Sequence, residues 1–371
     1  MIKPYTAVAL QVGFPVVRNR DDIKKISIPH VKRAMEVALP NAEVELPVRL
    51  VALPEAILEG WTAEYKYEHK RFCDEVAITI PGEETELLGE LAKRYKVYIM
   101  ANAKSIEPDI IRDRFFNCAF VLNPEGKVIL KHFKVQDPVW NNAIHPQDVW
   151  DAYVAKYGDG IEAFFQVADT EIGRMGCAIC TEGSFPDIFR ALGLQGAEIV
   201  YRPSYLEPYI SGPGNDWWEI QNRARALDNN FYMVCPNSAQ LYNDEPKRFD
   251  VCGGGSMIVD YRGRVLSKLP YNNEGAAVAK INIEELRDHR ERGIWGNWIS
   301  MLHTELYKKM YDRPIAPNNR FLRKPPGRNN FKYNEDTQRE NIKRLQKEGI
   351  FLPPSVSSED SGGGGRRTYV I

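Results

Sequence analysis

The sequence predicts a layered α/β fold, because short apolar runs alternate with amphipathic stretches along most of the chain. Strands are predicted at residues 7–12, 49–53, 97–101, 119–122, 128–130 and 198–201. Further strands are predicted directly before Cys180 and around Tyr232, Met257 and Ala277. Amphipathic helices are predicted at 22–39 and 84–94, after Cys180, and ahead of Asn229. The chain has 371 residues, of which 43% are hydrophobic, and this suffices for one large core.

The composition argues against several classes of protein. The formal net charge of −1 shows no global bias toward nucleic acid, and no run approaches the ~18 to 20 apolar residues that cross a bilayer. Four scattered cysteines, Cys73, Cys118, Cys235 and Cys252, lack framework spacing, and the N-terminus shows no secretory h-region. We therefore expect a soluble cytoplasmic protein that binds neither nucleic acid nor membrane.

The most informative segment is 173–190, in which Cys180 follows a short apolar run. Ser184 and Asp187 resemble a helix capping box, and Pro186 is tolerated in a first helical turn. A cysteine on a strand-to-helix loop would lie near backbone N–H groups and the positive end of a helix dipole, which both favour the thiolate. Cys180 is therefore a candidate nucleophile. The alternative is a small buried apolar residue.

Two upstream segments also place polar residues at strand ends. Glu55 follows the apolar run 48–53, and the strand after the turn at 123–126 brings Lys127, Lys131 and Lys134. A glutamate can take and return a proton, a lysine can stabilise an oxyanion, and a cysteine can carry an acyl group as a thioester. Together the three residue types form a plausible acyl-transfer set.

In this order the three segments resemble the nitrilase superfamily of carbon–nitrogen hydrolases, whose catalytic set is Glu-Lys-Cys. The likeness runs from Thr6 to about Ile283. It includes residues 223–237, which are similar to the family's RA-x-EN element with Asp228 at the usual glutamate, and the strand-turn-strand 254–266. The resemblance implies a four-layer αββα sandwich. Residues 196–204 and the long C-terminal extension look most like the aliphatic amidase and formamidase branch.

Carried over residue by residue, the resemblance implies that Glu55 is the general base and Cys180 the nucleophile. Lys134 matches the lysine that ends the family's triplet, here His132-Phe-Lys134. Lys131 and Lys127 are competitors for this role, and the alternative for each is a solvated charge on an exposed hairpin.

The rest of the site is expected around these three residues. The backbone N–H of Thr181 would supply a second oxyanion contact. Glu182, Tyr205 and Trp140 are expected to contact substrate, Trp140 from an aromatic-rich insertion at 138–160. The resemblance implies neither a metal nor an organic cofactor.

One departure from the family pattern concerns a second glutamate, which amidases of this kind carry soon after the lysine. Residues 135–150 contain none. Asp137, His145 or Asp148 could take its place, and each could equally be an ordinary loop residue. A second departure is Thr181, which stands where the nitrile-hydrolysing branch usually has tryptophan, so amide chemistry is favoured over nitrile chemistry.

Cys177 and Cys180 form a Cys-x-x-Cys pair, so redox and metal sites are alternatives. A zinc site needs about four ligands, and neither a second cysteine pair nor a close histidine supplies the others. Cys177 falls within the apolar run and is expected in the core. The redox alternative is therefore the weaker one.

The domain organisation is predicted as a catalytic domain at 1–285, an extension at 286–354 and a flexible tail at 355–371. In the family such extensions wrap a neighbouring subunit, and this would give the aromatic residues Trp295, Trp298, Phe321 and Phe331 a surface on which to pack. A homodimer or larger even homo-oligomer is therefore expected.

The function that the resemblance implies is hydrolysis of a small carboxamide to the acid and ammonia through a cysteine thioester. A nitrile or hydrazide substrate handled by the same three residues is the alternative. A third possibility is a catalytically silent member that serves as a binding or assembly module.

Overall fold

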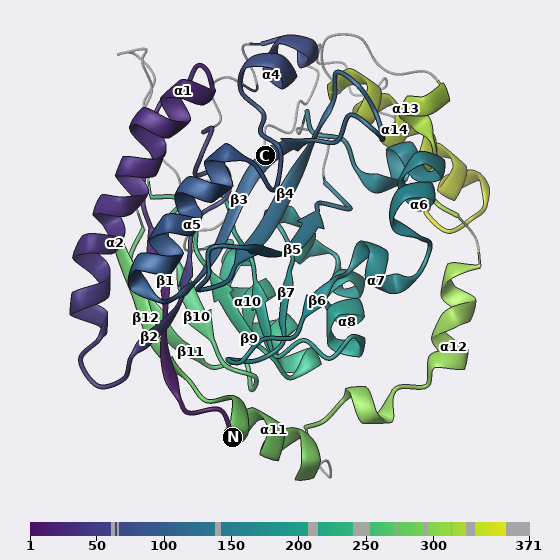
Figure 1. Ribbon diagram of the computed structural model, residues 1–371. Coiled ribbons are helices and arrows are strands. Elements are labelled where there is room, and N and C mark those ends of the chain that lie inside the picture. Colours follow the sequence, from purple (N-terminus) through teal and green to yellow (C-terminus); the bar gives the residue numbers. More distant parts are fainter. Residues whose placement is uncertain are drawn as a thin grey trace.

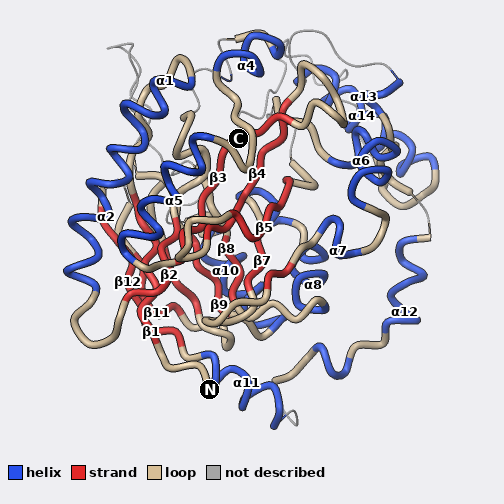
Figure 2. The backbone as a smooth tube through the Cα atoms, viewed as in Figure 1, coloured by secondary structure: helices blue, strands red, loops and turns tan. Residues whose placement is uncertain are grey.

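The computed structural model describes residues 1–60, 64, 67–137, 142–206, 214–239, 253–271, 273–292, 296–312, 314–323 and 331–353. Two six-stranded sheets lie against each other, with helices on their outer faces (Figure 1, Figure 2). The predicted four-layer α/β architecture is confirmed.

The first sheet brings the ends of two distant strands to one edge. Its strands, in spatial order, are β12 (Gly275–Ile281), β1 (Tyr5–Gln11), β2 (Val48–Ala52), β3 (Tyr98–Ile106), β4 (Phe115–Leu122) and β5 (Val128–Phe133). Strand β2 is parallel to β3, and β4 is antiparallel to both β3 and β5. Because β2 and β5 therefore run in the same direction, the residues that follow them emerge at the same edge.

The second sheet carries the Cys180 segment. Its strands, in spatial order, are β11 (Val265–Lys268), β10 (Met257–Val259), β9 (Tyr232–Cys235), β8 (Ile199–Tyr201), β7 (Met175–Cys177) and β6 (Val167–Ala168). Strands β7, β8 and β9 are parallel. Strand β6 was not predicted, because its two residues are only half-buried and form no apolar run.

Helices cover the outer face of each sheet. On the first sheet they are α1 (Arg20–Asp22), α2 (Ile28–Ala42), α4 (His69–Glu75) and α5 (Glu83–Tyr95). The predicted helix at 22–39 is interrupted by a π-helical turn at Ile23–Ser27. Helices α8 (Pro186–Leu194) and α10 (Trp217–Asn229) pack on the second sheet, and α6 (Trp150–Tyr157) and α7 (Ile161–Phe164) follow the first sheet in the chain.

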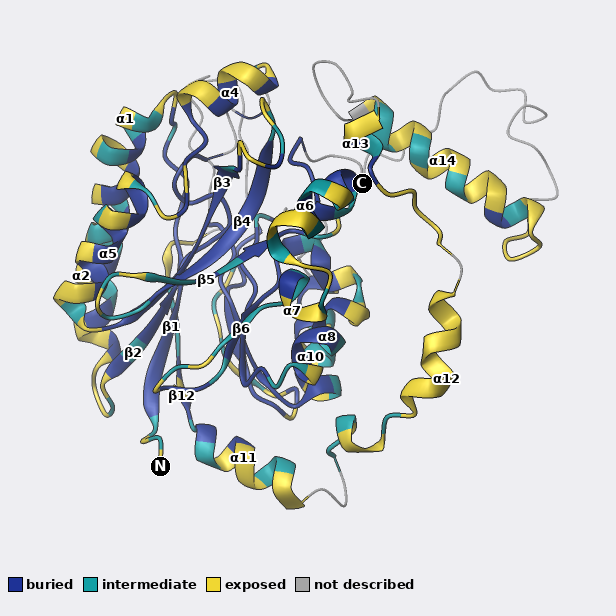
Figure 3. Cartoon of the chain, turned by 45° about the vertical axis from the view of Figure 1, so that its right-hand side comes forward, coloured by how far each residue is buried: buried dark blue, intermediate teal, exposed yellow. Residues whose placement is uncertain are grey.

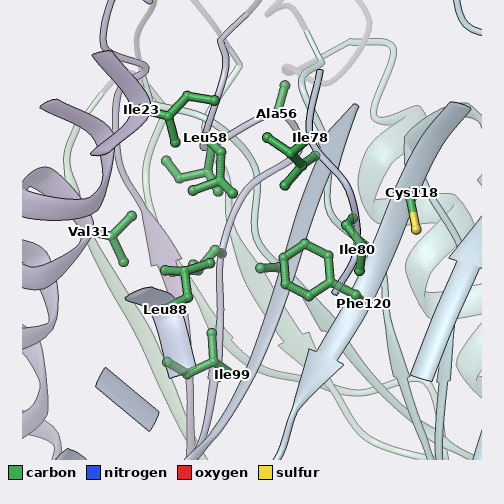
Figure 4. Close-up of a cluster of buried hydrophobic side chains, with 14 of the residues drawn as sticks. Ile23, Val31, Ala56, Leu58, Ile78, Ile80, Leu88, Ile99, Cys118 and Phe120 are labelled. Atoms are coloured by element: carbon green, nitrogen blue, oxygen red, sulfur yellow. The ribbon is translucent and has the colours of Figure 1, made fainter. Parts of the chain in front are cut away.

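The core has two parts, which follow from the alternation of side chains along each strand. In β1, Val8 belongs to the part beneath the helices, whereas Ala7 and Ala9 belong to the part that includes the second sheet. Small residues at these positions let the two sheets approach closely. Figure 4 shows the first part, where helical side chains such as Leu88 meet strand side chains such as Ile99.

The C-terminal extension leaves the body as an arm and then returns. Helix α11 spans Ile283–Arg292, so the predicted boundary at residue 285 falls inside it. Figure 3 shows α12 (Thr304–Lys308) exposed on the arm, while α13 (Arg320–Arg323) and α14 (Phe331–Lys347) lie back near α6. None of the described helices combines the length and the apolarity that a membrane crossing requires.

At least one aromatic residue of the extension packs within its own chain and needs no second subunit. Phe321 is 2% exposed and packs in the core of its own chain, because Asn319 anchors the segment by donating its backbone N–H to the carbonyl of Gln147. The side chain of Trp298 is exposed. Trp295, the side chain of Phe331 and the predicted tail at 355–371 lie outside the described residues.

Candidate active site

Glu55 lies just past the end of β2 and is 1% exposed. Its two carboxylate oxygens accept hydrogen bonds from different segments of the chain. Oε1 accepts from the side-chain amide of Asn117 at 2.7 Å, and Oε2 accepts from the backbone N–H of Tyr205 at 3.1 Å. Asn117 in turn accepts from Asn102 at 2.8 Å. The carboxylate is therefore fixed in orientation, as a proton-transfer group must be.

Lys134 follows β5 at the same edge and is 2% exposed. Its Nζ atom lies 2.8 Å from Asp137 Oδ2 and 3.6 Å from Glu55 Oε1. Burial lowers the pKa of Lys134, but the charges of Asp137, Glu55 and Cys180 outweigh burial and raise the pKa above its ordinary value. Lys134 is consequently a fixed ammonium group. The pKa of Asp137 is lowered, because the charges of Lys134 and His145 outweigh burial.

Cys180 occupies a left-handed backbone conformation, with φ +48°, at the start of the 3-10 turn Cys180–Ser184. Its backbone is fixed on both sides. Its N–H donates to the carbonyl of Pro203 at 2.8 Å, and its carbonyl accepts from Arg202 Nε at 2.9 Å and Nη2 at 2.7 Å. Such a conformation persists only when its surroundings hold it, and it is common at functional sites.

Arg202 fills the space beneath this turn and is completely buried. Its guanidinium also donates to Asn222 and Gln221, both at 2.6 Å, and lies 4.7 Å from the ring centroid of Trp218. A side chain at Gly183 would overlap the guanidinium, so the turn requires glycine there. The nucleophile segment is therefore built around a buried cation.

Two predictions about the Cys180 segment are wrong. Burial, followed by the charge of Glu55, raises the pKa of the Cys180 thiol to about 12, although Lys134 and a hydrogen bond from the Tyr205 backbone lower it, so the resting side chain is a thiol and not a thiolate. The capping box is also absent: α8 begins after Phe185 without a side-chain cap, and Ser184 Oγ accepts from Gln221 instead.

The residues predicted to contact substrate have different surroundings. Glu182 is fully buried, and its carboxylate is engaged by His132 Nε2 at 2.9 Å and by the backbone N–H groups of Val135 and Ile179 at 2.7 and 2.5 Å. It therefore ties the Lys134 loop to the Cys180 loop. This geometry gives no support to a contact between Glu182 and substrate.

Thr181 and Tyr205 lie beside the three central residues. The hydroxyl of Thr181 donates to Asp137 Oδ1 at 2.8 Å. Tyr205 contributes its backbone N–H to Glu55, and its ring stacks on Phe14 with centroids 5.3 Å apart. The oxyanion contact of Thr181 stays a prediction, and Trp140 lies outside the described residues.

Three residues were candidates to replace the second glutamate of the family, and of these Asp137 is the one that contacts Lys134. His145 and Asp148 pair with each other, with Nδ1 and Oδ2 3.1 Å apart. A further carboxylate, Glu64, was not predicted. It is buried, and its Oε2 lies 3.5 Å from Lys104 Nζ. Burial raises the pKa of Glu64, although the charge of Lys104 lowers it, and the charges of Glu55 and Asp137 raise it further.

The alternatives to Lys134 lie away from the candidate site, and the redox and metal alternatives for the cysteine pair gain no support. Lys131 donates to Glu107 at 2.7 Å and to the carbonyl of Ile80, and Lys127 belongs to the exposed turn before β5. Cys177 is completely buried within β7, and burial raises the pKa of its thiol well above the ordinary value. Among the described residues no cluster of three potential metal ligands occurs.

Several residues that shape the site were missed in the sequence. Asn102 and Asn117 interrupt the apolar strands β3 and β4, and Arg202 directly follows the apolar strand β8. A polar side chain inside an apolar strand must find a partner when buried. That signal could have marked all three residues, but not their partners.

The family of the chain follows from comparison with known proteins. Residues 27–291 match the model of the carbon–nitrogen hydrolase family, and the chain belongs to that family. It is 29% identical over 246 residues to the omega-amidase NIT2-B of Xenopus laevis, an alignment that covers 66% of this chain and 80% of the relative.

Solved structures show the same fold. The carbon–nitrogen hydrolase of Helicobacter pylori G27 aligns with a TM-score of 0.63 at 19% identity, over 84% of this chain and 99% of the other. A glutamate-to-leucine mutant of the amidase from Nesterenkonia sp. AN1 aligns with a TM-score of 0.58 at 17% identity, over 82% and 97%. In that mutant the acetamide moiety of fluoroacetamide is bound covalently to the active-site cysteine.

Proposed function

We propose that this protein hydrolyses a small carboxamide to the acid and ammonia through a thioester on Cys180. One observation carries the proposal: Glu55, Lys134 and Cys180 come from three distant segments and meet in a buried site, where the charges of Glu55 and Lys134 both act on the Cys180 thiol. The protonated state of the thiol means that a base must act during attack, and Glu55 is the fixed carboxylate beside it.

The first half of the reaction forms the thioester. Glu55 takes the thiol proton as the sulfur of Cys180 bonds to the amide carbon. The negative charge on the carbonyl oxygen is stabilised by the ammonium of Lys134 and by the backbone N–H of Thr181. When the carbon–nitrogen bond breaks, Glu55 returns the proton to the nitrogen, and ammonia leaves.

The second half releases the acid. Water attacks the thioester carbon while Glu55 accepts one of its protons, and the same two groups stabilise the oxyanion again. The carbon–sulfur bond then breaks and the proton returns to the sulfur. Asp137 acts in both halves as the fourth charged residue, because its carboxylate holds the ammonium of Lys134 in place.

The activities of similar proteins favour an amide substrate. The omega-amidase of Xenopus laevis and the amidase of Nesterenkonia sp. AN1 both act on amides by name, and the latter uses a cysteine that binds an acetamide moiety covalently. These activities belong to those proteins. For this chain they support the choice of a carboxamide.

The test is ammonia release by the purified protein from short amides, each paired with its matching nitrile. We expect release from amides that is lost in Cys180→Ala and in Glu55→Gln. Cys177→Ala is the matched control, because it removes a buried cysteine of the same strand-loop segment and should retain turnover. Release from nitriles alone would contradict the proposal. A folded protein that binds amides without turnover would point to a silent member of the family.

A further inference from the structure

Glu64 is a buried carboxylate that the proposed mechanism does not use. It is 2% exposed and belongs to the segment that follows β2 and Glu55. Its Oε1 atom accepts from the backbone N–H of Asn142 at 3.2 Å, and its backbone carbonyl accepts from the side-chain amide of Asn142 at 3.3 Å. Since Asn142 follows β5 and Lys134 in the chain, Glu64 joins the segment of the assigned base to the segment of the assigned lysine.

Carboxylates hold the loop after β5 at two points. The backbone N–H of Val135 donates to Glu182 Oε1 at 2.7 Å, and the backbone N–H of Asn142 donates to Glu64. Glu182 comes from the nucleophile segment, whereas Glu64 comes from the segment after β2. Each of the other two segments of the candidate site therefore anchors this loop once.

Asp137 lies between these two anchors in the chain. Its carboxylate contacts Lys134 Nζ at 2.8 Å and accepts from the Thr181 hydroxyl at 2.8 Å. Because the Lys134 ammonium is paired with this carboxylate, a shift of the loop at its far anchor would move the ammonium as well. A misplacement of about 1 Å is enough to slow an enzymatic reaction strongly.

Strand β3 holds Glu64 in place. Lys104 is completely buried, and its Nζ atom lies 3.5 Å from Glu64 Oε2. Asn102, two residues earlier on β3 and therefore on the same face, accepts from the backbone N–H of Ala56 at 2.8 Å. One strand thus fixes both the residue that directly follows Glu55 and the carboxylate that anchors the loop after β5.

The charges of the candidate site also reach Glu64. Burial raises the pKa of Glu64 and the charge of Lys104 lowers it, while the charges of Glu55 and Asp137 raise it further. Carboxylates act on one another in this way over short distances. Glu64 therefore belongs to the group of buried charges around Glu55, and its direct contacts are those with Asn142 and Lys104.

We propose that Glu64 is a positioning residue. It holds the loop after β5, and with it Asp137 and the Lys134 ammonium, in register with Glu55. The oxygen that accepts from the Asn142 N–H carries this role, whereas the negative charge of Glu64 balances Lys104. The consequence for catalysis rests on the proposed function, and the hold on the loop does not.

Two double variants isolate the acceptor oxygen. Removal of Glu64 alone would leave Lys104 as an unpaired buried cation, so both variants also carry Lys104→Met. Glu64→Leu then removes the acceptor, and Glu64→Gln retains it as an amide oxygen. With Glu64→Leu we expect kcat to fall about tenfold with little change in KM, and with Glu64→Gln we expect kcat to stay within about threefold of the unsubstituted protein.

Hydrogen exchange measures the hold on the loop without any turnover. Mass spectrometry of peptides that cover residues 135–145 should show faster exchange with Glu64→Leu and unchanged exchange with Glu64→Gln, each combined with Lys104→Met. Glu59→Gln is the matched control, because Glu59 is a buried carboxylate that accepts from the backbone N–H of Lys104 at 3.0 Å and forms no hydrogen bond with the described part of the loop. It should leave both kcat and the exchange of this peptide unchanged.

The path from Glu64 to the ammonium is tested with Asp137→Asn. If Glu64 acts through Asp137, the two losses should not multiply. In the presence of Asp137→Asn, the change to Glu64→Leu with Lys104→Met should lower kcat by less than about twofold further. Losses that multiply fully would show that Glu64 does not act through Asp137 and would overturn the positioning role.

The outcomes separate the positioning role from the proposed function. Equal exchange in the two double variants would overturn the hold of Glu64 on the loop. Faster exchange with an unchanged kcat, or an equal loss of kcat in both double variants, would overturn its role in catalysis. If the unsubstituted protein turned over no amide, the proposed function would fail, and the exchange comparison would still decide whether Glu64 fixes the loop.

Discussion

Arg202 fixes the peptide group that joins Cys180 to Thr181. Two of its nitrogens donate to the carbonyl oxygen of Cys180. Because the peptide is planar and trans, the N–H of Thr181 must point to the side opposite that carbonyl. The buried guanidinium therefore orients the backbone donor to which we assign the oxyanion, although Arg202 itself has no place among the reacting groups.

This relationship predicts the effect of Arg202→Lys. A lysine cannot reproduce the two parallel donors or the remaining contacts of the planar guanidinium. We expect kcat to fall by about a hundredfold with little change in KM, since the loss concerns the transition state. Arg223→Lys, at a half-exposed site on α10, serves as the control. An unchanged kcat in a folded Arg202→Lys protein would refute the role.

Asp137→Asn tests the fourth carboxylate. The neutral amide leaves Lys134 with Glu55 as its nearest anion, so the ammonium should shift toward the base and away from the oxyanion position. We expect kcat to fall about 10- to 100-fold, the usual effect of a misplaced catalytic group. Asp151→Asn, at an exposed position of α6, is the matched control. Equal rates for the two variants would remove Asp137 from the mechanism.

The raised pKa of Cys180 predicts its alkylation profile. With a pKa of about 12, the thiolate fraction grows about tenfold for each pH unit between pH 7 and 9. Modification of Cys180 by iodoacetamide, followed by peptide mass spectrometry, should rise steadily over this range. Cys180→Ser shows the background. A plateau below pH 8 would mean that the resting residue is already a thiolate.

Buried Glu59 predicts a pH dependence of stability. Burial raises its pKa from 4.5 to about 8, against the opposing charge of Lys104. Between these two values the folded state binds more protons than the unfolded state, so the stability that this group contributes falls as the pH rises and is lowest above about pH 8. Glu59→Gln should flatten this slope and raise the free energy of unfolding at pH 8.5 by a few kcal/mol.

Urea unfolding at pH 5.5 and pH 8.5 measures this difference. Glu68→Gln provides the control, because Glu68 is exposed at the start of α4. Parallel pH profiles for Glu59→Gln and the unsubstituted protein would contradict the assignment.

The arm predicts self-association. Leu306 and Met310 are 62% and 66% exposed on the arm, and we propose that this apolar strip packs against a second copy of the chain. Leu306→Glu combined with Met310→Glu should lower the mass measured by light scattering from that of an even oligomer to that of a monomer. Lys308→Glu, between them, should not. A monomeric unsubstituted protein would contradict the proposal.

The pattern of apolar runs predicted a layered α/β fold and the segments of the site for a physical reason, and the family resemblance implied that there are four layers. Glu55 and Cys180 follow apolar runs that had to be buried strands. Glu55 and Lys134 follow strands of the first sheet that end at the same edge, whereas Cys180 follows β7 of the second sheet. Partners between distant segments were not predictable in the same way. The pairing of Arg202 with the Cys180 carbonyl, of Glu182 with His132, and of Arg320 with Asp148 depends on how the two sheets and the extension pack.

Local rules also failed where tertiary contacts outweighed them. Ser184 has the spacing of a helix cap, yet its hydroxyl bonds to Gln221 from α10. Cys180 has the loop position that favours a thiolate, yet burial and Glu55 dominate its pKa. Phe321 lies in a charged, proline-rich stretch without periodicity, yet it completes the core of its own chain.

Because the C-terminal extension folds back onto the body, the residues assigned to catalysis and the residues of the neighbouring pocket wall come from different parts of the chain. The residues assigned to bond cleavage lie between positions 55 and 205, whereas one wall of a pocket that Asp137 lines comes from the extension, from Ala316 to Arg320 and from Asn334 to Asn341. Selection could therefore redesign one stretch without touching the other. In an engineering experiment, exchanging the terminal helices between homologues would change the wall of this pocket and leave the residues assigned to bond cleavage unchanged.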